Sequence, residues 1–433
     1  MEPTLLIIFL YEVVCIILPP VLQLVLPEVW TESCNRTHLD AADNDTHVGF
    51  NASGDCSSAT SSIRVGMVMG TFAASAFVTA MPIGWLVHRV NPNWTYAFGL
   101  LFYGIGCACM ATSADVLRLS GAAIFCGTGN VFASVSGSTI VARMFTNEAS
   151  RSRIMYLLNV LTTAAYVGCY FLGTRAYKVA GHAVFFASLA GVLMVGSVVY
   201  IALTKIWRHL DAHVETVTID PTPEYASLID GGDDSPQVDT TTYARVLRQP
   251  IALFAFLQMA CVYWGLATVA ATAPAWLQEK LAIGAVENGG ILGVSSLVDC
   301  VVVIALVALV DSNRKRWISF MVFILLQAAG CLAYPFVDGA IAAAVAETAI
   351  RSTKAVAMAS GPLVLLRIVD VCKVGTYSRV IALSKIGKYC GGILGTLVSP
   401  WLIKFFGFDI VYFSLSAILV PLGIGTVWYS KLS

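Results

Sequence analysis

Long apolar segments alternate with short polar ones along almost the whole chain. Each apolar segment is near the ~20 residues that a helix needs to cross the hydrocarbon core of a bilayer. Helices satisfy their backbone hydrogen bonds internally, so a bundle of α-helices is the form expected in lipid. We therefore predict an all-α membrane protein with twelve spanning helices. They cover residues 4–27, 62–87, 94–112, 117–141, 154–174, 182–204, 250–273, 286–310, 316–337, 340–366, 378–402 and 409–430.

The composition supports the membrane interpretation. Of the 433 residues, 58% are apolar and only 12% are charged, and the mean hydropathy is +0.78. Soluble proteins have roughly 25% charged residues, so membrane lipid is the natural solvent for this chain. The formal net charge is zero, which leaves no basic surface for nucleic acid. The first apolar segment is longer than the apolar region of a signal peptide, and we expect it to span the membrane.

The positions of lysine and arginine predict the orientation. With both termini in the cytosol, roughly twice as many of these residues flank the spans on the cytosolic side as on the opposite side. Two examples are the pair Arg151 and Arg153 and the run from Arg314 to Arg316.

The polar segment 28–61, between the first two spans, contains three acceptor sequences for N-glycosylation, at Asn35, Asn44 and Asn51. The charge rule places this segment outside the cytosol, where glycosylation takes place. Two independent signals therefore agree on the topology, although such short sequences also arise by chance. A fourth acceptor sequence, at Asn93, falls on the cytosolic side, and we expect it to stay unmodified.

Two of the twelve cysteines, Cys34 and Cys56, lie in the same outer segment. Because that compartment is oxidising, we predict a disulfide between them. The other cysteines lie mostly in spans, where they are expected to pack as small apolar side chains.

A second long polar segment, 205–249, separates six predicted spans from six. We predict a membrane domain over 1–204, a flexible cytosolic linker over 205–249 and a second membrane domain over 250–433. The linker contains a string that fits both an acidic dileucine and a tyrosine-based signal for sorting adaptors, with a chance match as the alternative. The residues that such adaptors would recognise are Glu224, Tyr225, Leu228 and Ile229.

Six spans, a long linker and six more spans are the layout of the major facilitator superfamily, in which two halves rock about a site near the membrane midplane. The sequence 84–89, after the second span, resembles the superfamily's motif between helices 2 and 3. Further strings resemble the vesicular monoamine and acetylcholine transporters. They are Gly127-Thr128-Gly129-Asn130, Phe145-Thr146-Asn147-Glu148, Leu247-Arg248-Gln249-Pro250, Ala273-Pro274-Ala275-Trp276-Leu277, Ile368-Val369-Asp370, Thr376-Tyr377-Ser378 and Lys404-Phe405-Phe406-Gly407-Phe408.

This resemblance covers nearly the whole chain. It implies a proton-coupled antiporter that loads amines into secretory or synaptic-type vesicles or endosomes, with the plasma membrane as a further location. The acids that this family carries in the seventh, tenth and eleventh helices fall here on Ala270, near Met358 and on Lys385. Only the acid of the first helix has a counterpart, Glu12, which is therefore the carboxylate expected to couple transport to protons.

Ionisable side chains deep in the predicted spans are the main functional candidates, because each is costly in lipid unless it meets a partner or a cavity. Glu347, Arg351 and Lys354 are spaced so that all three lie on one face of the tenth helix. The full set is Glu12, Asp299, Glu347, Arg351, Lys354, Lys385 and Lys388.

The resemblance also implies which helices meet, since the first, fourth, seventh and tenth line the central cavity in the superfamily. Glu12 and the charged face of the tenth helix would then share a substrate and proton site. The fourth helix would contribute Asn130 and Ser134, and the seventh would contribute the ring of Tyr263.

These residues also have structural interpretations. Glu347 and Arg351 can form an intrahelical pair near the outer surface, which needs no substrate. Lys385 and Lys388 can neutralise Asp299 in a buried charge network. The aromatic residue of the seventh helix can be a packing residue.

The charges suggest an alternative to an amine. The deep set holds three acids and four bases, whereas a carrier of cations should present surplus negative charge. A neutral or positive site suits an organic anion or a zwitterion, with Arg351 pairing a carboxylate or phosphate. A third alternative is a receptor-like protein that kept the fold and lost transport.

An enzyme finds no support in the sequence, which lacks a phosphate-binding loop, a nucleophile elbow and His/Cys clusters with metal spacing. We expect no cofactor and no metal. The expected partners are a small-molecule substrate, protons and membrane lipid.

Overall fold

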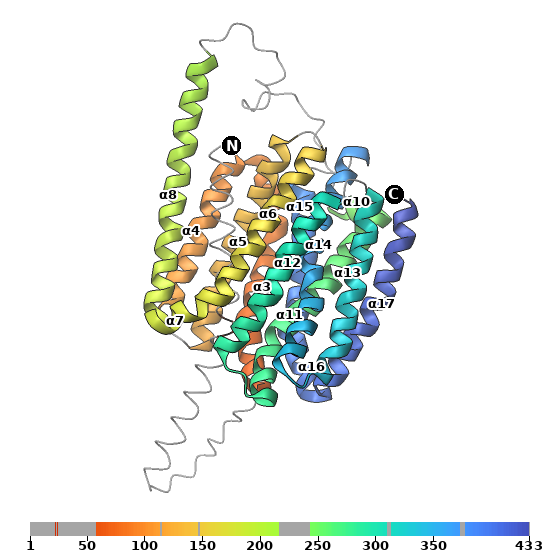
Figure 1. Cartoon of the computed structure of the whole chain (residues 1–433). Coiled ribbons are helices and arrows are strands. Elements are labelled where there is room, and N and C mark those ends of the chain that lie inside the picture. The colour runs from red at the N-terminus through yellow and green to blue at the C-terminus, as the bar shows by residue number, and fades with distance from the viewer. Residues whose placement is uncertain are drawn as a thin grey trace.

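The computed structural model describes residues 58–112, 115–145, 148–215, 243–309, 313–372 and 377–432, together with Leu22 and Leu24. These residues form helices that pack side by side in one bundle and are joined by short turns (Figure 1). No β-strand occurs among them. The predicted all-α class is confirmed.

Eleven of the twelve predicted spans fall on described helical segments. The first, 4–27, lies outside the described residues except for Leu22 and Leu24, which are helical. The unbroken helices are α3 (Ser58–Arg89), α4 (Pro92–Met110), α5 (Val116–Met144), α8 (His182–Glu215), α11 (Pro250–Leu281), α12 (Ala285–Leu309), α13 (Asn313–Ala333), α14 (Ala340–Cys372) and α17 (Phe408–Leu432).

Nine helical segments of the described residues are long and apolar enough to cross a membrane. Helix α14 is not among them, and its first half contains three charged residues, Glu347, Arg351 and Lys354. Glu347 and Arg351 are buried in the protein and do not face lipid.

The two remaining predicted spans, 154–174 and 378–402, are broken and longer than the sequence suggests. Helix α6 (Glu148–Gly168) passes through the π-turn η1 (Cys169–Gly173) into α7 (Thr174–Ala180). Helix α15 (Tyr377–Ile393) likewise passes through the π-turn η3 (Leu394–Val398) into α16 (Ser399–Phe406). A left-handed glycine ends each run, Gly181 with φ 77° and Gly407 with φ 90°, and the next helix begins directly after it.

Two hydrophobic clusters divide the bundle along the chain. One takes its residues from α3, α4, α5, α7 and α8, together with Leu22. The other takes its residues from α11, α12, α13, α14 and α17, joined by Tyr156 of α6 and by neighbouring turns. In chain order, α3 to α8 form the first cluster of helices and α11 to α17 form the second. Helix α3 packs against α15, and α6 packs against α12, so the two clusters of helices meet along these contacts.

The predicted linker is partly helical. Helix α8 continues past the predicted span end to Glu215, because extending an existing helix is easier than starting one. Near the end of the linker, α10 (Tyr243–Leu247) forms a short helix at the same end of the bundle as the carboxyl end of α17 (Figure 1).

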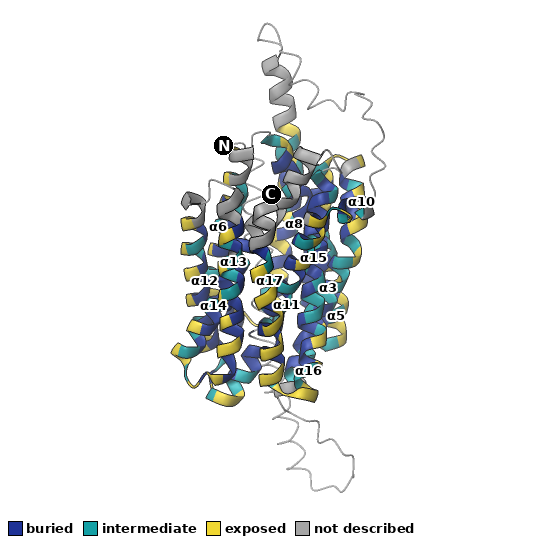
Figure 2. Cartoon of the chain, turned by 90° about the vertical axis from the view of Figure 1, so that its right-hand side faces the viewer, coloured by how far each residue is buried: buried dark blue, intermediate teal, exposed yellow. Residues whose placement is uncertain are grey.

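Glycines allow the closest helix contacts, as the small-residue runs of the fourth and eleventh spans suggest. A Cβ atom at Gly395 would lie 2.6 Å from the backbone oxygen of Trp264, and one at Gly129 would lie 2.5 Å from the backbone nitrogen of Tyr103. Small residues let helix backbones approach and pack in the absence of a hydrophobic driving force between them. Exposed residues lie mainly on the outer faces and at the ends of the helices, and buried residues lie on the faces that other helices cover (Figure 2).

Candidate functional site

A buried ion pair on α14 forms the centre of the candidate site. Nε of Arg351 donates to Oε2 of Glu347 at 2.8 Å, one helical turn away. Glu347 is 1% exposed and Arg351 is 8% exposed. Buried pairs of this kind are costly unless further hydrogen bonds satisfy the remaining polar atoms.

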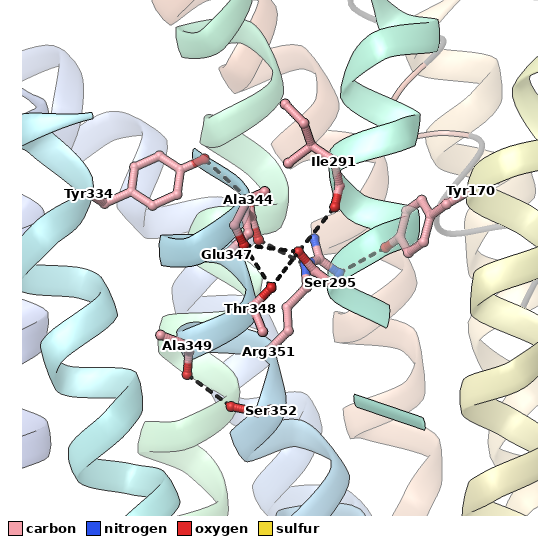
Figure 3. A network of polar contacts seen from close by, with 10 residues as sticks. All are labelled: Tyr170, Ile291, Ser295, Tyr334, Ala344, Glu347, Thr348, Ala349, Arg351 and Ser352. Atoms are coloured by element: carbon pink, nitrogen blue, oxygen red, sulfur yellow. Dashed lines mark hydrogen bonds and ion pairs between the residues drawn. The ribbon is translucent and has the colours of Figure 1, made fainter. Parts of the chain in front are cut away.

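Two tyrosines from other segments supply those hydrogen bonds (Figure 3). The hydroxyl of Tyr334, in the 3₁₀ turn η2 (Tyr334–Phe336), donates to Oε1 of Glu347 at 3.2 Å. Nη1 of Arg351 donates to the hydroxyl of Tyr170 in η1 at 2.9 Å. Both carboxylate oxygens of Glu347 are therefore engaged, and Arg351 connects α14 to the π-turn of the opposite cluster of helices.

Hydroxyl groups fix α12 against α14 beside the ion pair (Figure 3). Oγ1 of Thr348 donates to Oγ of Ser295 at 3.2 Å. The Ser295 hydroxyl in turn reaches the backbone oxygens of Ile291, at 3.1 Å, and Ala344, at 3.4 Å. These contacts fix the position of α12 along the axis of α14.

Lys354 lies further along the same helix and meets an aromatic pair. Its ammonium group stands 3.1 Å from the centre of the Tyr166 ring, which places a cation over an aromatic face. Tyr166 stacks on Tyr170, with ring centres 6.1 Å apart. The positive charges of Arg351 and Lys354 therefore both contact tyrosines of the segment formed by α6 and η1.

Asp299 is the second buried carboxylate, 3% exposed, and its Oδ1 has no hydrogen-bond partner in the part of the chain that the structure describes. Asp299 lies on α12, one helical turn after Ser295, which contacts Ala344 and Thr348 of α14. The bases that act electrostatically on Asp299 include Lys354 and Arg351 of α14. A network of Asp299 with Lys385 and Lys388 stays a prediction.

Lys388 on α15 extends the positive charge toward the other predicted residues. Its ammonium group lies 5.4 Å from the ring centre of Tyr263 and 5.7 Å from that of Tyr389, and it acts electrostatically on Lys354. Nδ2 of Asn130 on α5 donates to the hydroxyl of Tyr389 at 2.7 Å. The contact joins the first cluster of helices to the second.

Ser134, one turn after Asn130, is buried and its hydroxyl has no partner among the described residues. The same holds for the hydroxyl of Tyr263. Lys385 is half-buried on α15, one turn before Tyr389. Oriented polar groups of this kind, without protein partners, suit a site that receives a polar ligand.

The structure thus brings five predicted charges into one electrostatic group and places Asn130 and Tyr263 beside it. Other predicted residues lie outside the described part of the chain. They are Glu12, the glycosylation acceptors Asn35, Asn44 and Asn51, the cysteines Cys34 and Cys56, and the sorting residues Glu224, Tyr225, Leu228 and Ile229.

Sequence reasoning missed Tyr166, Tyr170 and Tyr334. The available signal was the tyrosine hydroxyl itself, since a buried tyrosine usually finds a hydrogen-bond partner. The spacing of Tyr166 and Tyr170, one helical turn apart in an apolar span, could also have placed them on one face.

Bases outnumber acids among the described members of this electrostatic group. The bases are Arg351, Lys354 and Lys388, and the acids are Asp299 and Glu347. Among the described residues, no group of His, Cys, Asp and Glu is arranged to hold a metal ion. The arrangement suits non-covalent binding of an anionic group between cations and aromatic rings.

Comparison with known proteins identifies the family. A family model described as Major Facilitator Superfamily matches residues 4–366. No curated protein matches the sequence. The crystal structure of the human organic anion transporter MFSD10 (TETRAN) superposes with a TM-score of 0.66, covering 98% of each chain at 13% identity. At that identity the likeness concerns the fold, whereas the family model covers well over half of the sequence. The chain belongs to the major facilitator superfamily, a family of membrane transporters.

Proposed function

We propose that the protein is a secondary transporter for an organic anion, or for a zwitterion that presents a carboxylate. The observation that carries this proposal is the charge of the site between the two clusters of helices. Three bases and two acids are described there, and Glu347 is already bound to Arg351 and Tyr334. This surplus of positive charge would stabilise an anionic solute.

The geometry suggests how an anion would bind. The Lys354 ammonium group rests on the Tyr166 ring and makes no ion pair within 4 Å among the described residues. A carboxylate, phosphate or sulfonate would give that charge a stronger, charge-assisted partner. The rings of Tyr166 and Tyr263 would contact the apolar part of the solute, which favours an aromatic or branched organic anion.

The amine implied by the resemblance to vesicular carriers is the competing candidate. The unpartnered oxygen of Asp299 is the observation that favours it. A cationic amine in this position would also face Lys354 and Lys388, and like charges in a medium of low polarity repel strongly. MFSD10, whose structure has the same fold, is an organic anion transporter, which agrees with the sign of the charge.

We propose further that protons drive transport. Asp299 would bind the proton, because its charge acts directly on Lys354 and Arg351. Protonating Asp299 removes a negative charge from the site, which favours an anion. A proton and an anion would therefore move in the same direction, whereas an amine carrier would exchange protons for its substrate. Glu12 remains the other candidate carboxylate.

Uptake into proteoliposomes distinguishes these substrates. Benzoate and benzylamine share a ring and carry opposite charges, and phenylalanine serves as the zwitterion. We expect uptake of benzoate or the zwitterion when the outside is acidic, and little uptake of benzylamine. Uptake of benzylamine driven by an acidic interior would overturn the proposal. No uptake of any solute would favour a receptor-like protein.

Two lysines provide a matched pair of variants. Lys354→Met removes the cation beside Tyr166, and we expect roughly a tenfold loss of benzoate affinity or more. Lys205 is exposed near the end of α8, 6.0 Å from the ring centre of Trp94, so Lys205→Met removes a similar contact away from the site. Equal uptake by the two variants would exclude Lys354 from the binding site.

Asp299→Asn tests the coupling. The variant should still exchange labelled for unlabelled benzoate without a gradient, but a pH gradient should no longer accelerate uptake. Full acceleration in Asp299→Asn would transfer the coupling role to Glu12, for which Glu12→Gln is the corresponding variant.

A vesicular or endosomal location remains part of the proposal. It rests on the sorting string at Glu224, Tyr225, Leu228 and Ile229.

A further inference from the structure

The two broken helices repeat one local structure in the two clusters. In each, a helix passes through a five-residue π-turn into a short helix and ends at a left-handed glycine. The sequences of the turns, Cys-Tyr-Phe-Leu-Gly and Leu-Gly-Thr-Leu-Val, share no pattern. The short helices α7 and α16 lie at the same end of the bundle, which the charge rule places outside the cytosol (Figure 1).

Each π-turn packs on a pair of glycines from the opposite cluster. A Cβ atom at Gly289 of α12 would lie 2.8 Å from the carbonyl oxygen of Tyr170, and one at Gly293 would lie 2.7 Å from the ring of Phe171. Real Cβ atoms almost never approach other atoms so closely, so only glycine permits these contacts. The two glycines are one turn apart and face the same side of α12.

The second π-turn makes the same contact in the other direction. Cβ atoms at Gly66 and Gly70 of α3 would collide with the carbonyl oxygen of Thr396 and the side chain of Leu397 in η3. The two glycine pairs have identical spacing. Four short segments from both clusters therefore meet at the outer end of the bundle through close contacts at glycines.

Tyr170 belongs both to one of these contacts and to the charged site. Its backbone oxygen lies against Gly289, and its buried hydroxyl accepts from Nη1 of Arg351 (Figure 3). A substrate anion that binds Arg351 competes with this hydroxyl for the guanidinium group. Loss of the hydrogen bond removes the contact that holds η1 toward α14.

We propose that η1 with Gly289 and Gly293 forms a latch that keeps the outer side closed, and that Tyr170 couples this latch to anion binding at Arg351. Tyr170 is thus a positioning residue for transport. The coupling rests on the proposed function, whereas the latch itself does not depend on the identity of the substrate.

The native thiol of Cys169 reports the state of the latch. Cys169 lies in η1 next to Tyr170 and is buried as a free cysteine. The experiment measures the rate at which a membrane-impermeant maleimide, added from the outer side, labels Cys169 in the full-length protein. Mass spectrometry of the peptide that contains Cys169 separates its signal from those of other cysteines.

Neighbouring glycines of α12 give a matched test of the latch. Gly289→Val inserts side-chain atoms against the carbonyl oxygen of Tyr170, whereas a Cβ atom at Gly290 meets nothing within 4 Å. We expect Gly289→Val to raise the labelling rate roughly tenfold and Gly290→Val to leave it within about twofold of the parent. If Gly289→Val does not fold, Gly289→Ala still places a Cβ atom 2.8 Å from that oxygen. Equal labelling of the Gly289 and Gly290 variants would overturn the latch.

Tyr170→Phe tests the coupling, because it keeps the ring and removes the hydroxyl. In the parent, saturating benzoate should change the labelling rate roughly fivefold. In Tyr170→Phe, benzoate should still bind, yet labelling should no longer respond to it. A benzoate response retained in Tyr170→Phe would refute the coupling. If benzoate neither binds nor moves through the parent, the proposed function fails, while the glycine variants still decide the latch.

Discussion

At the scale of single residues, two cations of α14, the buried Arg351 and the half-buried Lys354, have different surroundings. Arg351 has a carboxylate at 2.8 Å and a tyrosine hydroxyl at 2.9 Å. Lys354 has an aromatic ring and no ion pair within 4 Å among the described residues. Groups kept in an unfavourable environment are expected at functional sites, where stability is traded for activity. The contrast predicts opposite effects of mutation.

Replacing one charged residue at a time should distinguish a structural role from a role in binding. Glu347→Gln leaves Arg351 buried without its carboxylate and should destabilise the protein by about 3 kcal/mol. Lys354→Met removes a poorly compensated cation, so the thermal unfolding midpoint in detergent should stay the same or rise, although benzoate affinity falls. A clear loss of stability in Lys354→Met would assign Lys354 a structural role.

The sequence could predict part of this site. Helical spacing placed Glu347, Arg351 and Lys354 on one face of the tenth span, and α14 presents Glu347 and Arg351 to the protein interior. The contact with Tyr170 could not be predicted in the same way. Tyr170 lies in a different span, and helical spacing does not say which residues of two spans meet.

At the scale of elements, backbone contact decides how the helices pack. Helix α15 approaches α11 so closely that a Cβ atom at Gly391 would lie 2.7 Å from the backbone nitrogen of Trp264. It would also collide with the carbonyl oxygen of Ala260. Neither atom can move without shifting α11. The next residue, Gly392, is different, since its Cβ would lie 3.4 Å from Cβ of Ala73.

Alanine at these two adjacent positions should therefore act in opposite ways. Gly391→Ala forces the helices apart and should cost about 1–3 kcal/mol, as overpacking does elsewhere. Gly392→Ala makes an ordinary contact and gains helix propensity, so it should be neutral or stabilising by up to about 1 kcal/mol. Thermal unfolding of both variants in one detergent provides the measurement. Equal midpoints would show that α15 and α11 do not pack this tightly.

The length of the apolar segments was enough to predict where the spans lie, because a helix needs that length to cross the hydrocarbon core of a bilayer. It could not predict the breaks at η1 and η3. Hydropathy averages over a window and carries no information about a single extra residue in one turn. The short helices α7 and α16 were missed for a related reason, since both follow directly on apolar spans.

At the scale of the whole molecule, the two clusters of helices and their connection determine what can move. The clusters meet along α3 with α15 and α6 with α12. The hydrogen bond from Asn130 to Tyr389 and the one from Arg351 to Tyr170 both cross between them. The candidate site therefore lies where rocking of the halves would change its contacts, as alternating access requires. The orientation of this assembly in the membrane is a separate question, for which the sequence provides the test.

Glycosylation can fix that orientation, because acceptor sequences lie on both sides of α3. The predicted acceptors Asn35, Asn44 and Asn51 precede α3, whereas Asn93 follows it at the start of α4. At ~1.5 Å per residue, a helix as long as α3 separates these two groups by more than the thickness of the hydrocarbon core. Only one group can then face the compartment in which glycans are added.

We expect the three outer acceptors to carry glycans and Asn93 to carry none. The charge rule places Asn93 on the cytosolic side, where glycans are not added. In the folded protein its side-chain oxygen accepts a hydrogen bond from the hydroxyl of Tyr200 at 2.6 Å. Replacing the three outer asparagines by Gln should raise the gel mobility to that of the glycosidase-treated parent. Asn93→Gln is the matched control and should leave the mobility unchanged. A shift in Asn93→Gln alone would reverse the orientation. The positive charges would then face away from the cytosol, and the end of the bundle that we propose to be latched would be the cytosolic one.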